Sequence, residues 1–265
     1  MLECVINISE GSRLDVVEQL ATIAGDSLLD LHSDADHNRS VLTLVGENSP
    51  RAVTRAAVQE LDLRIHSGVH PRIGVVDVVP FVPLGHATLA DAEVAADRFA
   101  QWAGAELALP CFRYGTGRSL PRVRRGAFVD FGPDWGPPAP HPTAGAVAVG
   151  ARPPLIAYNL WLATPDLAEA RALARELRGP AVRALGLAVG DQVQVSMNLI
   201  DPMSVGPGDV YDRVAAGAEI ERAELVGLIP QAVLGRCATA RWTQLDLAAD
   251  RTIESRLEAR GFNLA

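Results

Sequence analysis

The chain has 265 residues, of which 48% are hydrophobic and 21% charged, a composition typical of a globular protein that buries a substantial core. Its formal net charge of −8 argues against a protein that binds nucleic acid by neutralising phosphates. Cys4, Cys111 and Cys237 form no CxxC pair and predict a reducing compartment without disulfides. We find no signal peptide and no apolar run long enough to span a membrane, so we expect a cytoplasmic protein.

The first half of the chain alternates short β-branched runs with amphipathic stretches. The predicted strands cover residues 3–8, 27–31, 40–45, 75–82 and 110–114. The predicted helices cover 15–23, a segment that opens at Ser49-Pro50, and 89–103. This order, β-α-β-β-α-β followed by an extension, predicts a ferredoxin-like plan.

Residues 115–142 are rich in Gly, Pro and Arg and show no periodicity. A connection of this length is usually either disordered or functional. We expect the arginines in and beside it to form a solvated face: Arg113, Arg118, Arg122, Arg124 and Arg125.

The second half repeats the order of the first. Strands are predicted over 155–162, 182–189, 193–200 and 223–229, with helices over 165–177 and 208–221 and more helix after Gln231. The predicted fold is therefore α+β, a tandem duplication of ferredoxin-like (βαββαβ) subdomains, 1–152 and 153–265, with a long Pro/Gly-rich loop.

Histidines gather in two segments, 32–39 and 66–74. His70 precedes Pro71, which favours extended backbone, and a nearby glycine allows a ligand to approach closely. An imidazole so placed suits proton transfer near neutral pH, although an ordinary surface histidine is an equal alternative. For His66, at the end of the preceding helix, we favour a structural role.

The same segments offer a second interpretation, a metal site. Its candidate ligands are His32, Asp34, Asp36, His37, His66 and His70. Gly68 and Pro71 oppose one continuous helix through His66 and His70, which argues against helical ligand spacing. We therefore expect no metal and keep a metal-dependent hydrolase as an alternative.

Arg39, Arg72 and Arg152 are candidates for carboxylate recognition, because a guanidinium group binds a carboxylate with two parallel hydrogen bonds. The alternative is a local salt bridge for each, such as Arg39 with Asp36. Small residues repeat through 141–152 and allow the backbone to approach a flat ring. Asn198 is either a ligand contact or an ordinary sheet amide.

Taken in chain order, these segments resemble the formimidoyltransferase family of folate enzymes in histidine breakdown. The resemblance covers nearly the whole chain and is carried by Glu3–Gly11, Asp36–Ser40, Gly68–Gly74, Asp77–Pro83, His141–Arg152, Ile156–Leu160, Val195–Asp201 and Glu224–Pro230. It implies two ferredoxin-like subdomains and a homodimer. The implied reaction moves a formimino (or formyl) group between an N-substituted glutamate and tetrahydrofolate, the co-substrate, with no metal.

The resemblance also implies residue roles. His70 is the general base. The folate-binding residues are Gly136, Pro137, Pro140, His141, Pro142, Thr143, Ala144 and Gly145. The substrate-binding residues are Asn38, Arg39, Arg72, Arg152 and Asn198. The expected partners are small molecules, with neither nucleic acid nor membrane.

The sequence departs from the family pattern at two positions near the predicted site. Val69 stands where the family commonly has Glu, and His32 stands where some members have an acidic residue. We also expect no cyclodeaminase domain. Val69 motivates one further alternative, a folate-binding or regulatory protein without transferase activity.

Overall fold

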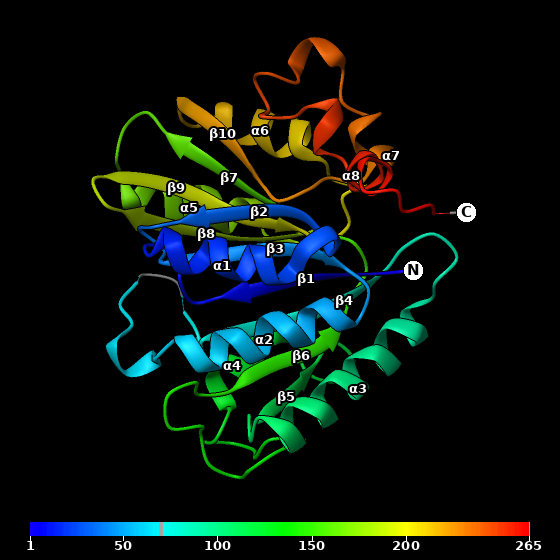
Figure 1. The fold of residues 1–265 in the computed structure, drawn as a ribbon. Helices are drawn as coiled ribbons and strands as arrows, with labels where there is room; N and C mark the ends of the chain where they lie inside the picture. Colours follow the sequence, from blue (N-terminus) through cyan, green and yellow to red (C-terminus); the bar gives the residue numbers. More distant parts are fainter. Residues whose placement is uncertain (69–70, 265) are drawn as a thin grey trace. The chain divides into compact units, whose positions relative to one another are not determined.

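The computed structural model describes residues 1–68 and 71–264. It divides into two compact units, each built around one sheet (Figure 1). Unit 1 is Met1–Pro153 together with the C-terminal Leu264, and unit 2 is Pro154–Asn263. Both units mix helices and strands, so the predicted α+β class is confirmed. None of the described helices is long and apolar enough to cross a membrane.

Unit 1 contains a six-stranded sheet with the order β2-β3-β1-β4-β6-β5. Neighbouring strands are antiparallel from β2 to β4, whereas β6 is parallel to both β4 and β5. In chain order the elements are β1 (Leu2–Ile8), α1 (Leu14–Ala24), β2 (Leu28–Asp34), β3 (Arg39–Val45), α2 (Asn48–Glu60), β4 (Val76–Pro83), α3 (Leu89–Glu106), β5 (Cys111–Tyr114), α4 (Leu120–Gly126) and β6 (Val147–Ala151). The strands predicted in the first half are confirmed.

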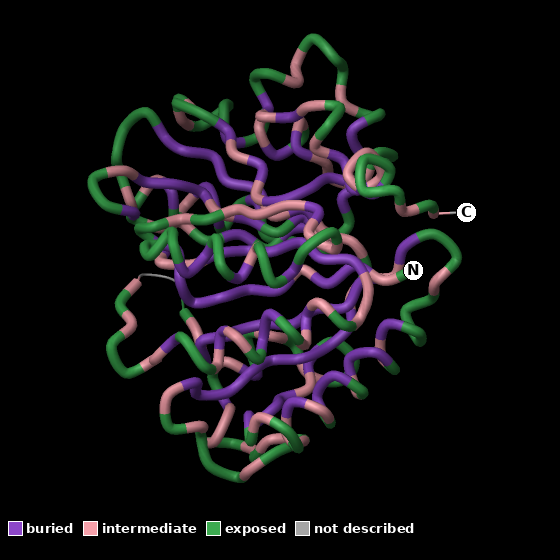
Figure 2. Tube along the Cα trace, in the orientation of Figure 1, coloured by how far each residue is buried: buried purple, intermediate pink, exposed green. Residues whose placement is uncertain are grey.

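The main core of unit 1 lies between the sheet and the helices α1, α2 and α3, which run along it (Figure 1). Cys4, Ile6 and Ile8 are fully buried in this core, as expected where every second residue of a strand faces the same side. The central strands are buried over most of their length (Figure 2). Side chains at the ends of these strands are therefore held by a rigid sheet.

A smaller core covers the other face of the sheet beside β5 and β6. Val123 of α4 packs there with Phe112 and Val78, and Phe128 and Phe131 add edge-on ring contacts to Phe112. The prediction that 115–142 has no regular structure is therefore wrong for α4. Ser119 caps this helix by accepting a hydrogen bond from the backbone N–H of Arg122, and a proline stands in its first turn.

Unit 2 contains a four-stranded antiparallel sheet with the order β10-β7-β9-β8. Its elements are β7 (Ile156–Leu162), α5 (Leu167–Leu177), β8 (Val182–Val189), β9 (Gln192–Leu199), α6 (Pro207–Ala215), β10 (Ile220–Val226), α7 (Gln231–Leu234) and α8 (Ile253–Ala259). The prediction of a helix over 208–221 is wrong at its C-terminal end, because α6 stops at Ala215 and β10 already begins at Ile220.

Candidate functional site

The predicted site segments of unit 1 meet at one edge of its sheet. β1 ends at this edge, and β3, β4 and β6 begin there, because β1 is antiparallel to β3 and β4 while β6 is parallel to β4. We call this the site edge and define it by four loops, 9–13, 35–38, 61–75 and 127–146. It contains both histidine-rich segments and the predicted folate loop.

The end of the predicted folate loop is hydrogen-bonded to the segment 61–75. The N–H of Leu63 donates to the carbonyl of Thr143 at 2.7 Å, and the N–H of Val75 donates to that of Ala144 at 3.0 Å. Gly74 pairs with Gly145, and a Cβ added to Gly74 would lie 1.9 Å from the carbonyl oxygen of Ala146. The two segments therefore form one joint that admits no side chain at Gly74.

His141 shapes the turn at the end of this loop. Its backbone exchanges hydrogen bonds with Gly145, at 2.8 and 3.0 Å. Its Nδ1 accepts from the N–H groups of Thr143 and Ala144, so Nδ1 is unprotonated in this arrangement. Pro142 is exposed and Ala144 is buried. At the start of the loop, Gly136, at φ +85°, lies against the carbonyl of Leu109, just before β5.

Asn38 ties three loops of the site edge together. Its Oδ1 accepts from the N–H of Gly11 at 2.9 Å, and its Nδ2 donates to the carbonyl of Ser67 at 2.7 Å. Its φ of +45° is a conformation that asparagine adopts more readily than most residues. Asn38 therefore fixes the path of the chain leading into the His70 segment.

His66 is held by the same asparagine. Its Nε2 lies 3.0 Å from the carbonyl of Asn38, and because a carbonyl only accepts, Nε2 is the donor. Burial lowers the pKa of His66 despite this hydrogen bond, which favours the neutral ring. Its Nδ1 is buried and has no hydrogen-bond partner in the part of the chain that the structure describes.

A hollow of about 260 Å³ opens beside these loops. Its lining comes from 9–13, Asn38 and the segment around His66: Ser9, Glu10, Ser12, Arg13, Asn38, Leu61, Asp62, Ile65 and His66. Ile65 is 80% exposed and adds a large apolar side chain to this lining. The hollow thus offers both polar groups and an apolar surface.

Two acidic residues of the site edge are occupied by local partners. Glu10 accepts from the backbone N–H groups of Ser12 and Arg13 and pairs with the Arg13 guanidinium at 2.6 Å. Asp34 binds the ring of the buried His37 at 2.7 Å. Burial raises the pKa of Asp34, but the hydrogen bonds from His37 outweigh it and bring the pKa to about 2. Across residues 1–68 and 71–264, no three His, Cys, Asp or Glu gather as candidate metal ligands.

A second polar group lies where β1 meets β4. The register between these strands shifts here, with Asn7 opposite Val78 and Ile8 opposite Val76, so the intervening Asp77 is left without a partner on β1. A bulge of this kind redirects a side chain. One oxygen of the buried Asp77 accepts from the N–H of Ile73 at 2.9 Å, and the other pairs with Arg124 of α4.

This ion pair corrects the expectation that Arg124 belongs to a solvated face. Arg122 and Arg125 are exposed as expected, whereas Arg124 is half-buried against Asp77. The sequence contained one signal for the Asp77–Arg124 ion pair. An acidic residue inside the apolar run 75–82 requires a partner when the strand is buried.

Arg39 belongs to the same polar group. Its guanidinium donates to Oδ1 of Asn7 and not to Asp36, the local partner considered from the sequence. Burial lowers the pKa of Arg39 to about 10, Asp77 opposes this shift, and the positive charge of Arg124 adds to it. Arg39 and Arg124 are therefore close enough to repel each other.

His70 and Val69 lie outside the described residues. Their described neighbours are tightly placed, since Arg72 donates to the carbonyl of Gly68 at 2.6 Å and a Cβ on Gly68 would lie 2.6 Å from the carbonyl of His37. Gly68 and Gly74 themselves are therefore closely packed against other backbone.

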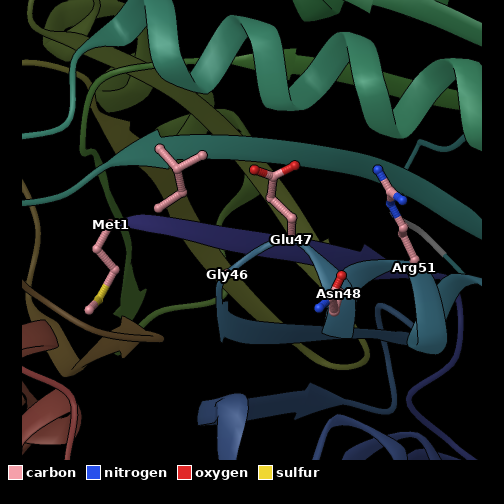
Figure 3. Close-up of a pocket in the computed structure, with 6 residues that line it drawn as sticks. Met1, Gly46, Glu47, Asn48 and Arg51 are labelled. Atoms are coloured by element: carbon pink, nitrogen blue, oxygen red, sulfur yellow. The ribbon is translucent and has the colours of Figure 1, made fainter.

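The structure does not bring Arg152 to the site edge. Arg152 follows β6, and its N–H donates to the carbonyl of Phe81 near the end of β4, at the opposite edge of the sheet. That edge carries a hollow of about 570 Å³ where β1 begins, lined by Met1, Leu2, Gly46, Glu47, Asn48 and Arg51 (Figure 3). Asn198 is an exposed residue of β9 in unit 2.

Comparisons with known proteins identify the family of the chain. Residues 1–152 match the model of the formiminotransferase domain, N-terminal subdomain. The chain is 34% identical to the glutamate formimidoyltransferase of Streptococcus pyogenes serotype M1 over 88% of the chain and 90% of the relative. It is 31% identical to the glutamate formimidoyltransferase of Thermoplasma acidophilum over 88% of the chain and 89% of the relative.

A longer relative matches over part of its length. The formimidoyltransferase-cyclodeaminase of Gallus gallus is 34% identical over 87% of the chain but only 50% of the relative, so the chain spans about half the length of that protein. The matches to the two shorter relatives cover most of both chains. The chain therefore belongs to the formiminotransferase family of transferases.

Proposed function

We propose that the protein transfers a formimino group between N-formimino-glutamate and tetrahydrofolate, and that the transfer takes place at the site edge of unit 1. The observation that carries this proposal is the joint between 61–75 and 143–146, which brings the predicted folate loop onto the segment of the predicted catalytic histidine. Family membership supplies the reaction class. The joint supplies a reason for placing both substrates at one edge.

His70 is the proposed general base. The attacking folate nitrogen forms a bond to the formimino carbon, and the imidazole takes the proton that this nitrogen loses. The bond from that carbon to the glutamate nitrogen then breaks, and the imidazolium returns the proton to the leaving nitrogen. No redox step occurs. Holding the two substrates together supplies a further part of the rate.

The proposed folate contacts are the loop residues 136–145 and the apolar surface of Ile65. A flat ring system gains from contact with glycine backbone and with an exposed apolar side chain, because both allow close approach. The exposed Ile65 lies in the segment 61–75, and the turn from His141 to Gly145 is hydrogen-bonded to the same segment. Asn38 is the proposed polar contact to the bound substrates, since it lines the hollow.

We further propose that the two units are the N- and C-terminal formiminotransferase subdomains, 1–152 and 153–265, and that they arose by duplication of one ferredoxin-like plan. In each unit the strands of the β-α-β-β-α-β segment follow the order fourth, first, third, second. A homodimer and a cytoplasmic location complete the proposal, by analogy with the family.

A donor screen tests the proposed reaction. Purified protein is incubated with tetrahydrofolate and either N-formimino-L-glutamate or N-formyl-L-glutamate, and the folate product and free glutamate are quantified by mass spectrometry. We expect catalytic turnover with the formimino donor. Turnover with the formyl donor alone would change the substrate. Tight binding of tetrahydrofolate, measured by calorimetry, without turnover on either donor would instead identify a folate-binding protein.

A further inference from the structure

Positive charge exceeds negative charge where β1, β3 and β4 meet in unit 1. Arg39, Arg72 and Arg124 all interact electrostatically with the buried carboxylate of Asp77. The other carboxylate near Arg39 is Asp34, which is bound to His37. A chain with a formal charge of −8 therefore places three partly buried arginines around one buried carboxylate.

The contacts of Arg39 and Arg124 leave part of each guanidinium unused. Arg39 is bonded to a neutral amide, Asn7, and Arg124 to the one carboxylate. Neither Nε has a hydrogen-bond partner within residues 1–68 and 71–264. Buried charges and buried donors are normally paired, since an unpaired one costs free energy.

We propose that Arg39 and Arg124 together form the binding site for one carboxylate of the glutamyl substrate. This inference rests on the proposed function for the identity of the ligand, but the anion site itself follows from the charges. A bound carboxylate supplies the missing negative charge and accepts hydrogen bonds from both guanidinium groups. The carboxylate of Asp77 competes with the bound anion for Arg124, and it accepts from the N–H of Ile73 at the start of β4.

The position of α4 explains why Arg124 serves in this site. Val123 and Gly126 are buried against the β5–β6 side of the sheet, which fixes the rotation of the short helix. Arg125, one residue further along, is exposed. Arg124 and Arg125 therefore offer a matched pair for experiment, since Arg124 is paired with Asp77 and Arg125 is exposed.

N-acetyl-L-glutamate, a stable N-acylated glutamate, is the probe for this site, with binding measured by calorimetry. For Arg39→Gln and for the charge-balanced double variant Asp77→Asn/Arg124→Gln, we expect roughly a ten- to hundredfold loss of affinity, the loss typical for a charge-assisted hydrogen bond. Arg125→Gln should bind like the wild-type protein. The double variant removes both partners of the Asp77–Arg124 ion pair, so neither of these two charges is left buried without the other.

We expect Asp77→Asn alone to change the affinity for the probe in the opposite direction. It removes the internal carboxylate while keeping an oxygen for the N–H of Ile73, so the anion should bind several-fold more tightly. Unchanged affinity in Arg39→Gln and in the double variant, weaker binding in Asp77→Asn, or no binding to the wild-type protein would each overturn the anion site.

The donor screen separates this proposal from the proposed function. If the wild-type protein binds the probe with the expected dependence on Arg39 and Asp77 but transfers no group, the anion site stands and the proposed reaction fails. If transfer occurs and the KM for the formimino donor is unchanged in Arg39→Gln and in the double variant, the reaction stands and the anion site fails.

Discussion

The two units use the same strand order but satisfy their polar groups differently. In unit 2, Glu224 on β10 accepts hydrogen bonds from Asn159 at 3.0 Å and from Trp161 at 2.8 Å, and Arg222 lies over the Trp161 ring. In unit 1, arginines outnumber the carboxylates around Asp77. A fully satisfied polar network rigidifies a core, whereas a buried charge that lacks partners costs free energy, which a bound ion of opposite charge recovers.

The loops at the strand ends differ in the same way. The site edge of unit 1 joins four loops through backbone hydrogen bonds and through Asn38. In unit 2, β8 and β9 are connected by a short turn at Gly190 and Asp191. The joined loops of the site edge are therefore longer than the turn between β8 and β9, and long connections are where binding residues most often lie.

The largest expected effect is that of Gly74→Ala, which disrupts the joint between the segments 61–75 and 143–146. The added methyl group would lie 1.9 Å from the carbonyl oxygen of Ala146. We expect a loss of about 3 kcal/mol or more in the free energy of unfolding, measured by urea denaturation, together with loss of transfer. Gly132→Ala is the control, since its added methyl group would have no atom within 4 Å, and it should change stability by less than about 0.5 kcal/mol. Equal stabilities for the two variants would mean that the joint is not rigid.

A smaller effect is expected from Glu224→Ala in unit 2. It leaves the buried amide of Asn159 and the indole N–H of Trp161 without their acceptor, which costs about 2 kcal/mol. Glu221→Ala, on the same strand, loses only an exposed hydrogen bond with Gln192 and should be nearly neutral. Thermal unfolding compares the two. If Glu224→Ala left stability intact, the balanced network would not be what stabilises unit 2.

The smallest expected effect is a loss of stability at low pH through Asp34. The pKa of Asp34 in the folded protein is about 2, below the ordinary value of 3.8. A carboxyl group with a lowered pKa stabilises the fold above its unfolded pKa, so this contribution is lost as the pH falls from about 4 to about 2. We expect a loss of about 1 kcal/mol after allowing for its partly exposed side chain. Urea unfolding between pH 5 and pH 2.5 should show a shallower slope for Asp34→Asn than for the wild-type protein, and identical slopes would contradict the Asp34–His37 pair.

Much of the fold could be predicted from the sequence, because buried strands such as β1 and β4 are marked by β-branched runs with clear boundaries. The short helix α4 could not, since seven residues with three arginines carry too little periodicity to stand out from a Gly/Pro-rich loop. The end of α6 was misplaced because Ala216 continues a helical composition, and only Gly217 marks the stop.

The candidate site divides in the same way. The two histidine-rich segments and the 141–145 turn could be recognised from local sequence, and the structure places the described residues of these segments at one edge. Arg124 was missed because its role depends on a partner far away in sequence, Asp77, which a bulge exposes. Arg152 was included because local sequence does not reveal at which end of a sheet a residue lies.

The most direct test of the central claim is the single-turnover rate of formimino transfer in His70→Ala, with tetrahydrofolate binding measured on the same samples. His86→Ala is the matched control, an exposed histidine beyond the end of β4, at the opposite edge from the site. We predict that His70→Ala still binds tetrahydrofolate but transfers about a hundred to ten thousand times more slowly, while His86→Ala transfers at the wild-type rate. Transfer at the wild-type rate in His70→Ala would contradict the assignment of the reaction to the site edge.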